Sequence, residues 1–282
     1  MKLVRYGALG AEKPGMIDQD GALRDLSGHL NDIEPSTLTK DRLSALRALD
    51  PGNLPLVDGQ PRYGACISGV PNFYCVGLNY VNHAKESGME PPAEPILFSK
   101  ATSCIQGPND EIIIPKGSVK SDWEVELGVV IGAVTEHVSE ADALNCVAGY
   151  CLINDMSERS FQIERGGQWI KGKSAPTFGP IGPWLVTTDE IPDPQVLPLW
   201  LKLNGKTVQN SNTSDMIFSV ATIVSYMSQF MRLMPGDVIA TGTPEGVGMG
   251  MKPPRYLVDG DQLELGIDGL GVQNQNVHAF GH

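Results

Sequence analysis

The sequence predicts a mixed α/β fold that is rich in short strands, and three observations support this prediction. The chain has 32 glycines and 21 prolines among 282 residues, well above their usual combined share of about 12%, so tight turns are expected to be frequent. Short apolar runs bounded by turn residues recur along most of the chain. Because these runs do not alternate regularly with helical segments, we expect a curled, mixed β-sheet and not a doubly wound parallel sheet.

Two parts of unequal size are expected. Residues 1–65 are interpreted as a small N-terminal α+β domain, and residues 66–282 as the main domain. The small domain is expected to begin with a strand over Lys2–Ala8 and to contain a helix over Thr39–Leu49. The segment PGNLPLVDGQPRYG that follows is rich in proline and glycine and therefore indicates a linker, with a boundary near Tyr63.

The main domain is expected to consist of short strands with few helices. The expected strands are FYCVG, PILFSK, DEIIIP, DWEVELGVVIG, AGYCLIND, GPWLV, LWLKLNGKTVQ, DVIATG and DQLELGI. Within LWLKLNGKTVQ, Asn204-Gly205 predicts a hairpin, because these residues accept the positive φ angles of a type I′ turn. The expected helices are Asn79–Ser87, Ser139–Val147, Ser157–Arg165 and Ser219–Leu233.

Charge and composition argue against several classes of protein. The formal net charge is −12, and an acidic surface repels phosphate backbones, so nucleic-acid binding is not expected. The longest apolar run is strand-sized and the N-terminus lacks a signal-peptide core, so we expect no membrane span and a cytoplasmic location. The five cysteines form no CxxC pair and are expected to be free thiols. Because the net charge is acidic, an anionic substrate must meet a local cation or a bound metal.

Acidic residues in two expected strands form the first candidate site. Asp122, Glu124 and Glu126 alternate along DWEVELGVV, so on a strand all three side chains project to one face. Neighbouring carboxylates repel each other unless a cation lies between them, and oxygen ligands suit Mg²⁺, Mn²⁺ or Ca²⁺. Asp155, at the end of AGYCLIND, is either a ligand, a helix cap or a plain turn residue. For the three alternating acids, the solvated edge of an amphipathic strand remains the alternative.

Three further segments contain candidate catalytic or binding residues. His83 and Glu86 lie three positions apart on an expected helix, where the carboxylate can orient the imidazole. An ordinary surface pair is the alternative. Lys171 and Lys173 lie in a glycine-rich stretch, where a lysine can neutralise an enolate or be a plain loop cation. The turn-rich segment ATGTPEGVG offers hydroxyl and N–H groups that could bind a carboxylate, or it is a plain loop.

Five motifs, taken in order, resemble those of the fumarylacetoacetate hydrolase family. They are VGLNYVNHAKE, DWEVELGVVIG, GYCLINDMSERSFQ, KGKS and ATGTPEGVG, within a resemblance that runs from about Asn72 to Ile267. The resemblance implies a curled β-roll, a homodimer, and a divalent metal, Mg²⁺ or Mn²⁺, that Ca²⁺ can replace in crystals. It also implies a small anionic 2-oxo acid as the substrate. The first 65 residues carry no motif and fit only the family's variable N-terminal domain.

The matching motifs imply a role for each candidate residue. The implied metal ligands are Glu124, Glu126 and Asp155. The implied catalytic residues are His83, Glu86 and Lys173, and the implied substrate-binding residues are Gln162, Lys173 and Thr243. His83, oriented by Glu86, would take a proton from the water that attacks the C4 carbonyl of the substrate. Lys173 and the metal would stabilise the enolate of the departing pyruvate.

The expected function is therefore metal-dependent hydrolysis of the C–C bond in a 2,4-dioxo acid of the acylpyruvate type. The segment SERSFQIERGGQWIKGKS, followed by TFGPIGPWLV, is most similar to the subgroup that hydrolyses 2,4-diketo-3-deoxy-L-fuconate or rhamnonate, members of which are often labelled ureidoglycolate lyase. We therefore expect a diketo sugar acid as the substrate. Ser160 and Pro176 stand where many members carry aspartate, and because neither is an implied metal ligand, these departures concern the choice of substrate more than metal binding.

Other functions remain open at this stage. An oxo-diacid decarboxylase or tautomerase would use the same enolate chemistry, and a ureidoglycolate lyase would break a C–N bond instead. A non-catalytic module that binds an oxo acid is the alternative from a different class. The presence of His83 beside three candidate ligands argues against such a module, because a binding protein needs no base.

Overall fold

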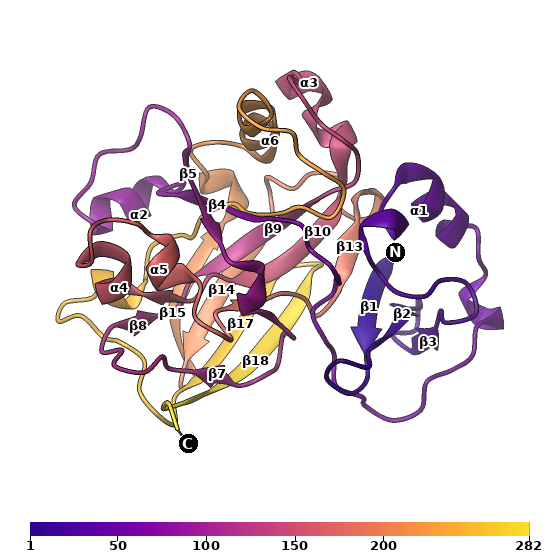
Figure 1. Ribbon diagram of the computed structural model, residues 1–282, viewed down its shortest axis with the longest axis horizontal. Helices are drawn as coiled ribbons and strands as arrows, with labels where there is room; N and C mark the ends of the chain where they lie inside the picture. The colour runs from indigo at the N-terminus through magenta and orange to yellow at the C-terminus, as the bar shows by residue number, and fades with distance from the viewer. Residues whose placement is uncertain (282) are drawn as a thin grey trace.

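The computed structural model describes residues 1–281, which form two main β-sheets with short helices around them (Figure 1). The larger sheet has nine strands in the order β3-β2-β1-β13-β10-β9-β16-β4-β5. The smaller sheet has five strands in the order β15-β14-β17-β18-β7. Most neighbouring strands are antiparallel, whereas β16 and β4 are parallel, which confirms the predicted strand-rich mixed α/β fold.

The bounds of the elements follow in four groups. The larger sheet contains β1 Lys2–Tyr6, β2 Lys13–Ile17, β3 Leu23–Asp25, β4 Phe73–Gly77, β5 Ile96–Lys100, β9 Val125–Ile131, β10 Val147–Asn154, β13 Leu185–Thr187 and β16 Val238–Ala240. The smaller sheet contains β7 Ile112–Ile113, β14 Pro198–Leu203, β15 Lys206–Asn212, β17 Gln262–Ile267 and β18 Gly271–His278. Two separate pairs of short strands are β8 Ser121–Asp122 with β11 Ser157–Glu158, and β6 Ile105–Gln106 with β12 Gly179–Pro180. The α-helices are α1 Lys40–Arg47, α2 Val81–Glu86, α3 Glu140–Ala143, α4 Arg159–Ile163, α5 Ile170–Lys173 and α6 Val220–Ser228.

The core lies between the two sheets, around β9 and β10. Every residue of these two strands is buried. Strands β14 and β17 of the smaller sheet contact β9, and β17 and β18 contact β10, so the smaller sheet covers one face of the central strands. Because every residue of both strands is buried, their other face is covered as well. Burial on both faces explains why these two strands appear in the sequence as nearly continuous apolar runs.

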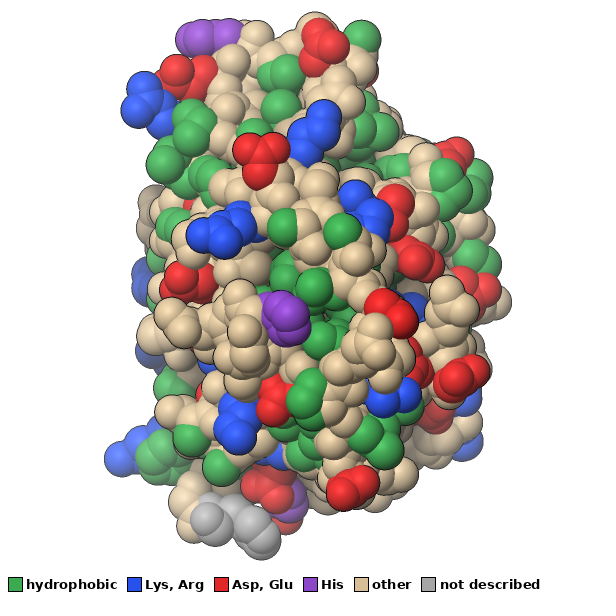
Figure 2. All heavy atoms as spheres, turned by 90° about the vertical axis from the view of Figure 1, so that its right-hand side faces the viewer, with side chains coloured by type: hydrophobic (Ala, Val, Ile, Leu, Met, Phe, Trp, Pro, Cys, Tyr) green, Lys and Arg blue, Asp and Glu red, His purple; other side chains and the backbone are tan. Residues whose placement is uncertain are grey.

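The N-terminal strands extend the larger sheet, because β1 pairs with β13 in the antiparallel direction. Figure 1 shows this part, in indigo, at one side of the molecule. Figure 2 views the same side and shows acidic and basic side chains interspersed, without an extended patch of one sign. The domain boundary at residue 65 stays a prediction. Within the described residues, no helix is long and apolar enough to cross a membrane.

The helix expected over Ser219–Leu233 ends earlier, as α6 at Ser228. Strand pairing corrects the limits of two further predicted helices. The helix expected over Ser139–Val147 ends as α3 at Ala143, and one 3₁₀ turn leads into β10 at Val147, which pairs with Ile131 of β9. The helix expected from Ser157 begins only at Arg159, because β11 first pairs with β8. In both places strand pairing replaces helix formation.

The sequence analysis missed β2, β3 and β18, and also the two-residue strands β6, β11 and β12. Strand β18 reads as polar, but Gln273 and Gln275 are buried and hydrogen-bonded. Gln273 Nε2 donates to the Leu152 carbonyl at 3.0 Å, and Asn154 Nδ2 donates to Gln275 Oε1 at 2.8 Å. Buried glutamines therefore take the place of the apolar residues that normally mark a strand. The predicted hairpin is confirmed, since β14 and β15 are joined by Asn204 and Gly205 with φ of 50° and 76°.

Candidate metal centre and catalytic site

Three buried carboxylates meet where β9 and β10 lie side by side. Oxygen atoms of Glu124, Glu126 and Asp155 all lie within 4.8 Å of one another. Glu124 immediately precedes β9, Glu126 lies in it, and Asp155 follows the last residue of β10. Because β10 pairs antiparallel with β9, the end of β10 faces the beginning of β9. The structure thus brings together the three residues that the motifs imply as metal ligands.

Buried cations neutralise two of these three acids. Lys173 Nζ, at the end of α5, lies 2.6 Å from Glu124 Oε2 and 2.7 Å from Asp155 Oδ2. Arg159 Nη2 lies 2.7 Å from Glu124 Oε1, and Lys100 of β5 donates to Asp155 Oδ1. All three cations are at most 3% exposed, so water screens these ion pairs little.

Glu126 has no cation of its own. Its Oε2 accepts a hydrogen bond from the Gly242 N–H at 2.8 Å, and among the described residues no lysine or arginine forms an ion pair with it. Burial raises the pKa of Glu126 well above its usual value, and the charges of Asp155 and Glu124 raise it further. Burial opposes ionisation of Glu124 as well, but Lys173 and Arg159 outweigh it and hold the pKa of Glu124 below its usual value.

This donor set fits a divalent cation. Three buried carboxylates supply oxygen ligands only, which hard cations such as Mg²⁺ and Mn²⁺ prefer. A buried carboxylate without a paired cation is costly, and an ion between the ligands removes that cost. Glu124, Glu126 and Asp155 are therefore the residues that can hold such an ion.

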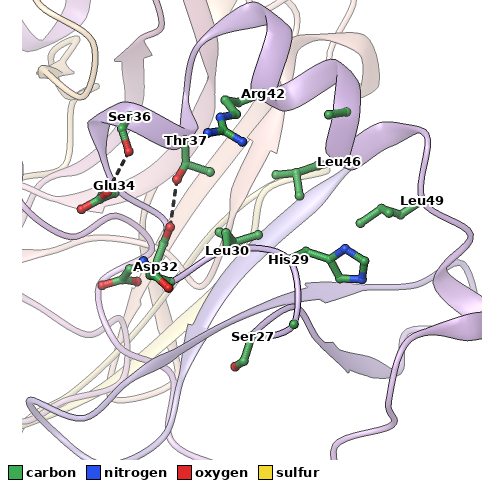
Figure 3. A pocket seen from close by; sticks show the side chains of 13 residues that line it. Ser27, His29, Leu30, Asp32, Glu34, Ser36, Thr37, Arg42, Leu46 and Leu49 are labelled. Carbon is green, nitrogen blue, oxygen red and sulfur yellow. Dashed lines mark hydrogen bonds between the residues drawn. The ribbon is translucent and has the colours of Figure 1, made fainter.

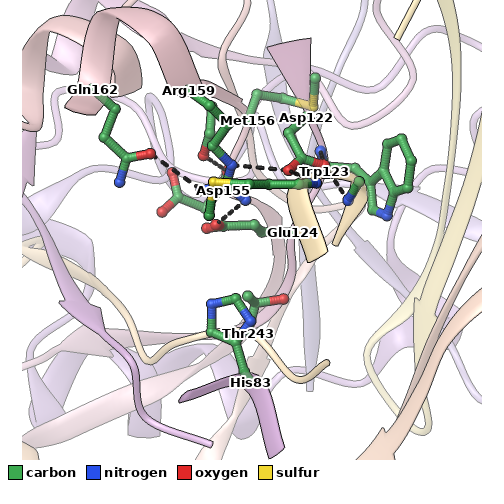
Figure 4. A network of polar contacts seen from close by, with 12 residues as sticks. His83, Asp122, Trp123, Glu124, Asp155, Met156, Arg159, Gln162 and Thr243 are labelled. Carbon is green, nitrogen blue, oxygen red and sulfur yellow. Dashed lines mark hydrogen bonds and ion pairs between the residues drawn. The ribbon is translucent and has the colours of Figure 1, made fainter. Parts of the chain in front are cut away.

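Asp122, the third acid of the predicted stripe, lies outside the acidic cluster. The strand is interrupted between β8 and β9, so the regular alternation of side chains does not extend to Asp122. Its Oδ2 accepts from Arg159 Nε at 2.8 Å, and its Oδ1 accepts the Gly248 N–H at 2.7 Å. Figure 4 shows Arg159 between Asp122 and Glu124. Asp122 thus fixes the arginine that pairs with Glu124.

The His83–Glu86 pair lies at one end of the site, on α2. His83 Nδ1 is 3.4 Å from Glu86 Oε2, and His83 is only 6% exposed, so the alternative of a surface pair is wrong. Both oxygens of Glu86 accept the Gly246 N–H, at 3.0 and 3.1 Å. The segment ATGTPEGVG therefore holds the carboxylate that orients His83. In Figure 4 the imidazole ring lies beside Thr243, across a gap from Glu124.

The remaining predicted residues divide into two groups. Gln162 and Thr243 face the same cavity as the acidic cluster. Gln162 Oε1 accepts from Arg159 Nη1 at 3.2 Å, and Thr243 Oγ1 donates to the Val125 carbonyl at 3.1 Å. Lys171 is exposed, donates to a backbone carbonyl in the loop before α5, and does not line the cavity.

The cavity has a volume of about 300 Å³, enough for a small organic acid. Its lining includes His83, Glu124, Glu126 and Lys173, whereas Asp155 and Glu86 are not among the lining residues. A second cavity of about 450 Å³ lies in the N-terminal part (Figure 3). None of the predicted site residues lines that second cavity, so the predicted chemistry gathers in the first.

Sequence reasoning missed several residues that support the site. Lys100 and Arg159 form the ion pairs described above, and both lie inside segments already examined as strand PILFSK and motif SERSFQ. Asn154 Oδ1 accepts the Glu124 N–H at 3.2 Å, and Gln209 Oε1 accepts the Val125 N–H at 3.0 Å. A charged residue at the end of an apolar strand, as at Lys100, was the available signal.

Comparisons with known proteins agree with this geometry. A protein of Burkholderia multivorans named "Putative hydrolase" is 61% identical over 99% of both chains. The fumarylacetoacetate hydrolase structure from Exiguobacterium antarcticum is 35% identical with a TM-score of 0.88 over 99% of both chains. A probable 2-hydroxyhepta-2,4-diene-1,7-dioate isomerase from Mycobacterium abscessus is 32% identical with a TM-score of 0.83, over 100% of both chains.

One further solved structure contains a metal ion. Maleylpyruvate hydrolase from Sphingobium sp. SYK-6, in complex with manganese(II) and pyruvate, is 27% identical over 99% of both chains, with a TM-score of 0.80. The model of the fumarylacetoacetate (FAA) hydrolase C-terminal family matches residues 72–278, which include every predicted site residue. The chain therefore belongs to the fumarylacetoacetate hydrolase family of enzymes.

Proposed function

We propose that this protein is a metal-dependent hydrolase that cleaves the C–C bond of an acylpyruvate, releasing pyruvate and a second acid. One observation carries the proposal: Glu124 and Glu126 of the acidic cluster, of which Glu126 pairs with no cation, line one cavity together with the buried Lys173 and with His83, which Glu86 contacts. Bound by Glu124, Glu126 and Asp155, a Mg²⁺ or Mn²⁺ ion supplies Lewis-acid chemistry to the oxygen atoms of a 2-oxo acid.

His83 is the base in this proposal. A water between the imidazole and the substrate loses its proton to Nε2 of His83 while its oxygen attacks the C4 carbonyl. Glu86 accepts from Nδ1–H, which fixes the tautomer with a free Nε2, and the Gly246 N–H fixes Glu86 in turn. Because His83 is nearly buried, few bulk waters compete with the water that reacts.

Lys173 and Gln162 act on the pyruvate half of the substrate. Attack at C4 leads to cleavage of the C3–C4 bond, and the electron pair passes to the pyruvate enolate. The Lys173 ammonium, whose raised pKa keeps it charged through its contacts with Asp155 and Glu124 despite burial, stabilises that negative charge. Gln162 Nε2, whose amide oxygen is engaged by Arg159, donates to the substrate carboxylate. Protonation at C3 then gives pyruvate.

The relatives support this proposal. The manganese and pyruvate in the maleylpyruvate hydrolase complex are the kind of ion and the product that we propose here. Because one of the relatives is a probable isomerase, we keep a second candidate function, that of an oxo-diacid decarboxylase or tautomerase.

A pyruvate-release screen over 2,4-dioxo acids, with Mg²⁺ or Mn²⁺ and an EDTA control, tests the proposal. We expect pyruvate from at least one acylpyruvate, and no pyruvate after chelation. Carbon dioxide release from oxaloacetate alone would favour the decarboxylase, and glyoxylate with urea from ureidoglycolate would favour the lyase. A form that binds these acids but converts none of them would indicate the non-catalytic module.

We also propose that the protein is a cytoplasmic homodimer. The family resemblance supports the dimer, and so do the exposed apolar side chains Val134, Phe230 and Met234 near the Thr135–Leu233 bridge. All five cysteines are free, which fits a reducing compartment. Light scattering of the purified protein measures the mass directly, and a monomer at micromolar concentration would contradict the dimer.

A further inference from the structure

We propose that the acyl end of the substrate is uncharged, apolar and flat, and that Trp169 with Phe98 selects it. This inference rests on the proposed function, because it concerns the half of an acylpyruvate that extends away from the acidic cluster. It names an aryl or unsaturated acyl group as the substrate class. The diketo sugar acid expected from the sequence would present several hydroxyl groups to the same wall.

Half of the 16 residues that line the cavity are polar or charged. Glu124, Glu126, Arg159 and Lys173 form or touch the acidic cluster. The remaining polar lining residues are His83, Gln162, Thr243 and Ser87. His83 and Gln162 act in the proposed reaction, and the Thr243 hydroxyl already donates to the Val125 carbonyl, which leaves Ser87. The other lining residues are apolar or glycine, namely Val76, Gly77, Leu78, Met89, Phe98, Ile163, Trp169 and Met249. The part of a substrate that does not contact the polar residues must therefore contact apolar side chains.

Trp169 and Phe98 form a fixed wall and not a loose loop contact. Their ring centroids lie 5.1 Å apart at an interplanar angle of 64°, an edge-to-face arrangement. Trp169 also lies directly on the backbone of Gly77, where an added Cβ would be 2.6 Å from the indole ring. The last position of β4 must therefore lack a side chain for Trp169 to occupy this place.

The same wall adjoins the catalytic lysine. Lys173 Nζ lies 5.1 Å from the Phe98 ring centroid, and Trp169 immediately precedes α5, which carries Lys173. A 2,4-dioxo acid held by Lys173 and the acidic cluster therefore extends its acyl group along Phe98 and Trp169. The faces and edges of these rings suit a flat, conjugated group.

No cation that lines the cavity is free to bind a second carboxylate of the substrate. The two cations that line the cavity, Arg159 and Lys173, are both paired with acids. A terminal carboxylate or a chain of hydroxyls would lose water on entering and find only Ser87 as an additional polar partner. A neutral apolar group loses no hydrogen bonds and gains contact with the rings.

The test compares substrates that differ only in the acyl group. We expect the Mn²⁺-loaded protein to cleave benzoylpyruvate with a kcat/KM about tenfold or more above that for acetylpyruvate. We expect 2,4-diketo-3-deoxy-L-fuconate and maleylpyruvate to fall below acetylpyruvate. Trp169→Ala should lower kcat/KM for benzoylpyruvate about tenfold or more and change that for acetylpyruvate less than about threefold. Trp169→Phe should restore most of the lost activity.

A matched control is Trp200→Ala in β14, which removes a tryptophan that does not line the cavity. It should leave the ratio between the two substrates unchanged. The inference would be overturned if a sugar acid or a diacid were cleaved as well as benzoylpyruvate. It would also be overturned if Trp169→Ala left the ratio of kcat/KM for benzoylpyruvate to that for acetylpyruvate unchanged. The proposed function would stand in both cases. If the wild-type protein cleaves no acylpyruvate, the proposed function fails. Calorimetry then tests the inference by itself: the affinity for benzoylpyruvate should exceed that for acetylpyruvate about tenfold or more, and equal affinities would overturn it.

Discussion

Two clusters of charged residues in this molecule look alike in composition and differ in how their charges are paired. The N-terminal cluster consists of Arg5, Glu12, Asp32, Arg62 and Asp110. Arg5 Nε lies 2.6 Å from Asp32 Oδ1, Arg62 Nη1 lies 2.9 Å from Glu12 Oε1, and Arg62 Nη2 lies 2.5 Å from Asp110 Oδ2. Every carboxylate of this cluster therefore faces an arginine.

The acidic cluster is also built from carboxylates and cations, but its pairing is incomplete. Lys173 and Lys100 pair with Asp155, and Lys173 also pairs with Glu124, whereas Glu126 receives only the N–H of Gly242. A cluster that only stabilises the fold has no reason to leave one buried carboxylate without a cation. The comparison indicates that Glu126, a carboxylate without a cation beside two other buried carboxylates, marks the site where a cation binds.

The largest effect is expected from His83→Ala. Loss of the base should lower kcat for acylpyruvate cleavage by about 10² to 10⁴, because proton transfer to a positioned side chain contributes that much. The affinity for Mn²⁺ should remain within about threefold of wild type, since His83 is not a ligand. Steady-state kinetics and calorimetry measure the two quantities. Near wild-type turnover would remove His83 from the mechanism and leave the acidic cluster without a catalytic partner.

A pair of matched variants tests the comparison itself. Glu126→Gln should weaken Mn²⁺ binding by about 10² or more, because it removes a ligand charge, and should not lower the melting temperature of the metal-free protein. Glu12→Gln in the N-terminal cluster should do the opposite, with unchanged Mn²⁺ affinity and a lower melting temperature. Calorimetry and thermal unfolding with EDTA give both values. Equal Mn²⁺ affinity in the two variants would break the comparison.

Lys173→Met separates the cations from the ligands within the acidic cluster. We expect kcat to fall about 10- to 10²-fold, because the enolate loses its cation. Mn²⁺ affinity should not fall, since the variant removes a positive charge that repels the ion. An affinity that drops together with kcat would mean that Lys173 shapes the ligand set and does not act on the substrate.

The smallest effect concerns the pH dependence of Glu12. Burial opposes its ionisation, but the hydrogen bond from Arg62 and the charge of Arg5 outweigh burial and lower the pKa of Glu12 below its usual 4.5. A carboxyl whose folded-state pKa is lowered stabilises the protein above its unfolded-state pKa, and the contribution disappears as the pH falls through the folded-state value. Glu12→Gln should therefore cost about 1 kcal/mol at pH 7 and progressively less below about pH 4.5. Urea unfolding at several pH values measures the difference, and a cost that is constant down to pH 3 would contradict it.

The sequence was most informative where secondary structure and chemistry share a pattern. The apolar runs of β9 and β10 predicted two strands, and the alternation of side chains placed Glu124 and Glu126 on one face. Only the family resemblance implied that Asp155 joins them, because spacing alone left its role open. Asp122 could not be separated from them, because the interruption between β8 and β9 arises from tertiary contacts with Arg159 and Gly248.

Other features depend on residues that are distant in the sequence. Buried Gln275 in β18 bonds to Asn154, 121 residues away, and no local pattern indicates this pair. Lys100 at the end of β5 also meets Asp155, although three strands separate β5 from β10 in the order of the sheet. The apolar wall was missed for the same reason, since Phe98 and Trp169 come from β5 and the loop before α5.

The most direct test of the central claim, that the unpaired carboxylate marks a metal site, is an anomalous difference map from crystals grown with Mn²⁺. We predict one dominant peak within about 2.5 Å of an oxygen of each of Glu124, Glu126 and Asp155. We predict no such peak at the N-terminal cluster, and loss of the main peak in Glu126→Gln crystals grown in the same way. The absence of manganese between these three carboxylates at saturating Mn²⁺, or a peak that persists in Glu126→Gln, would contradict the account.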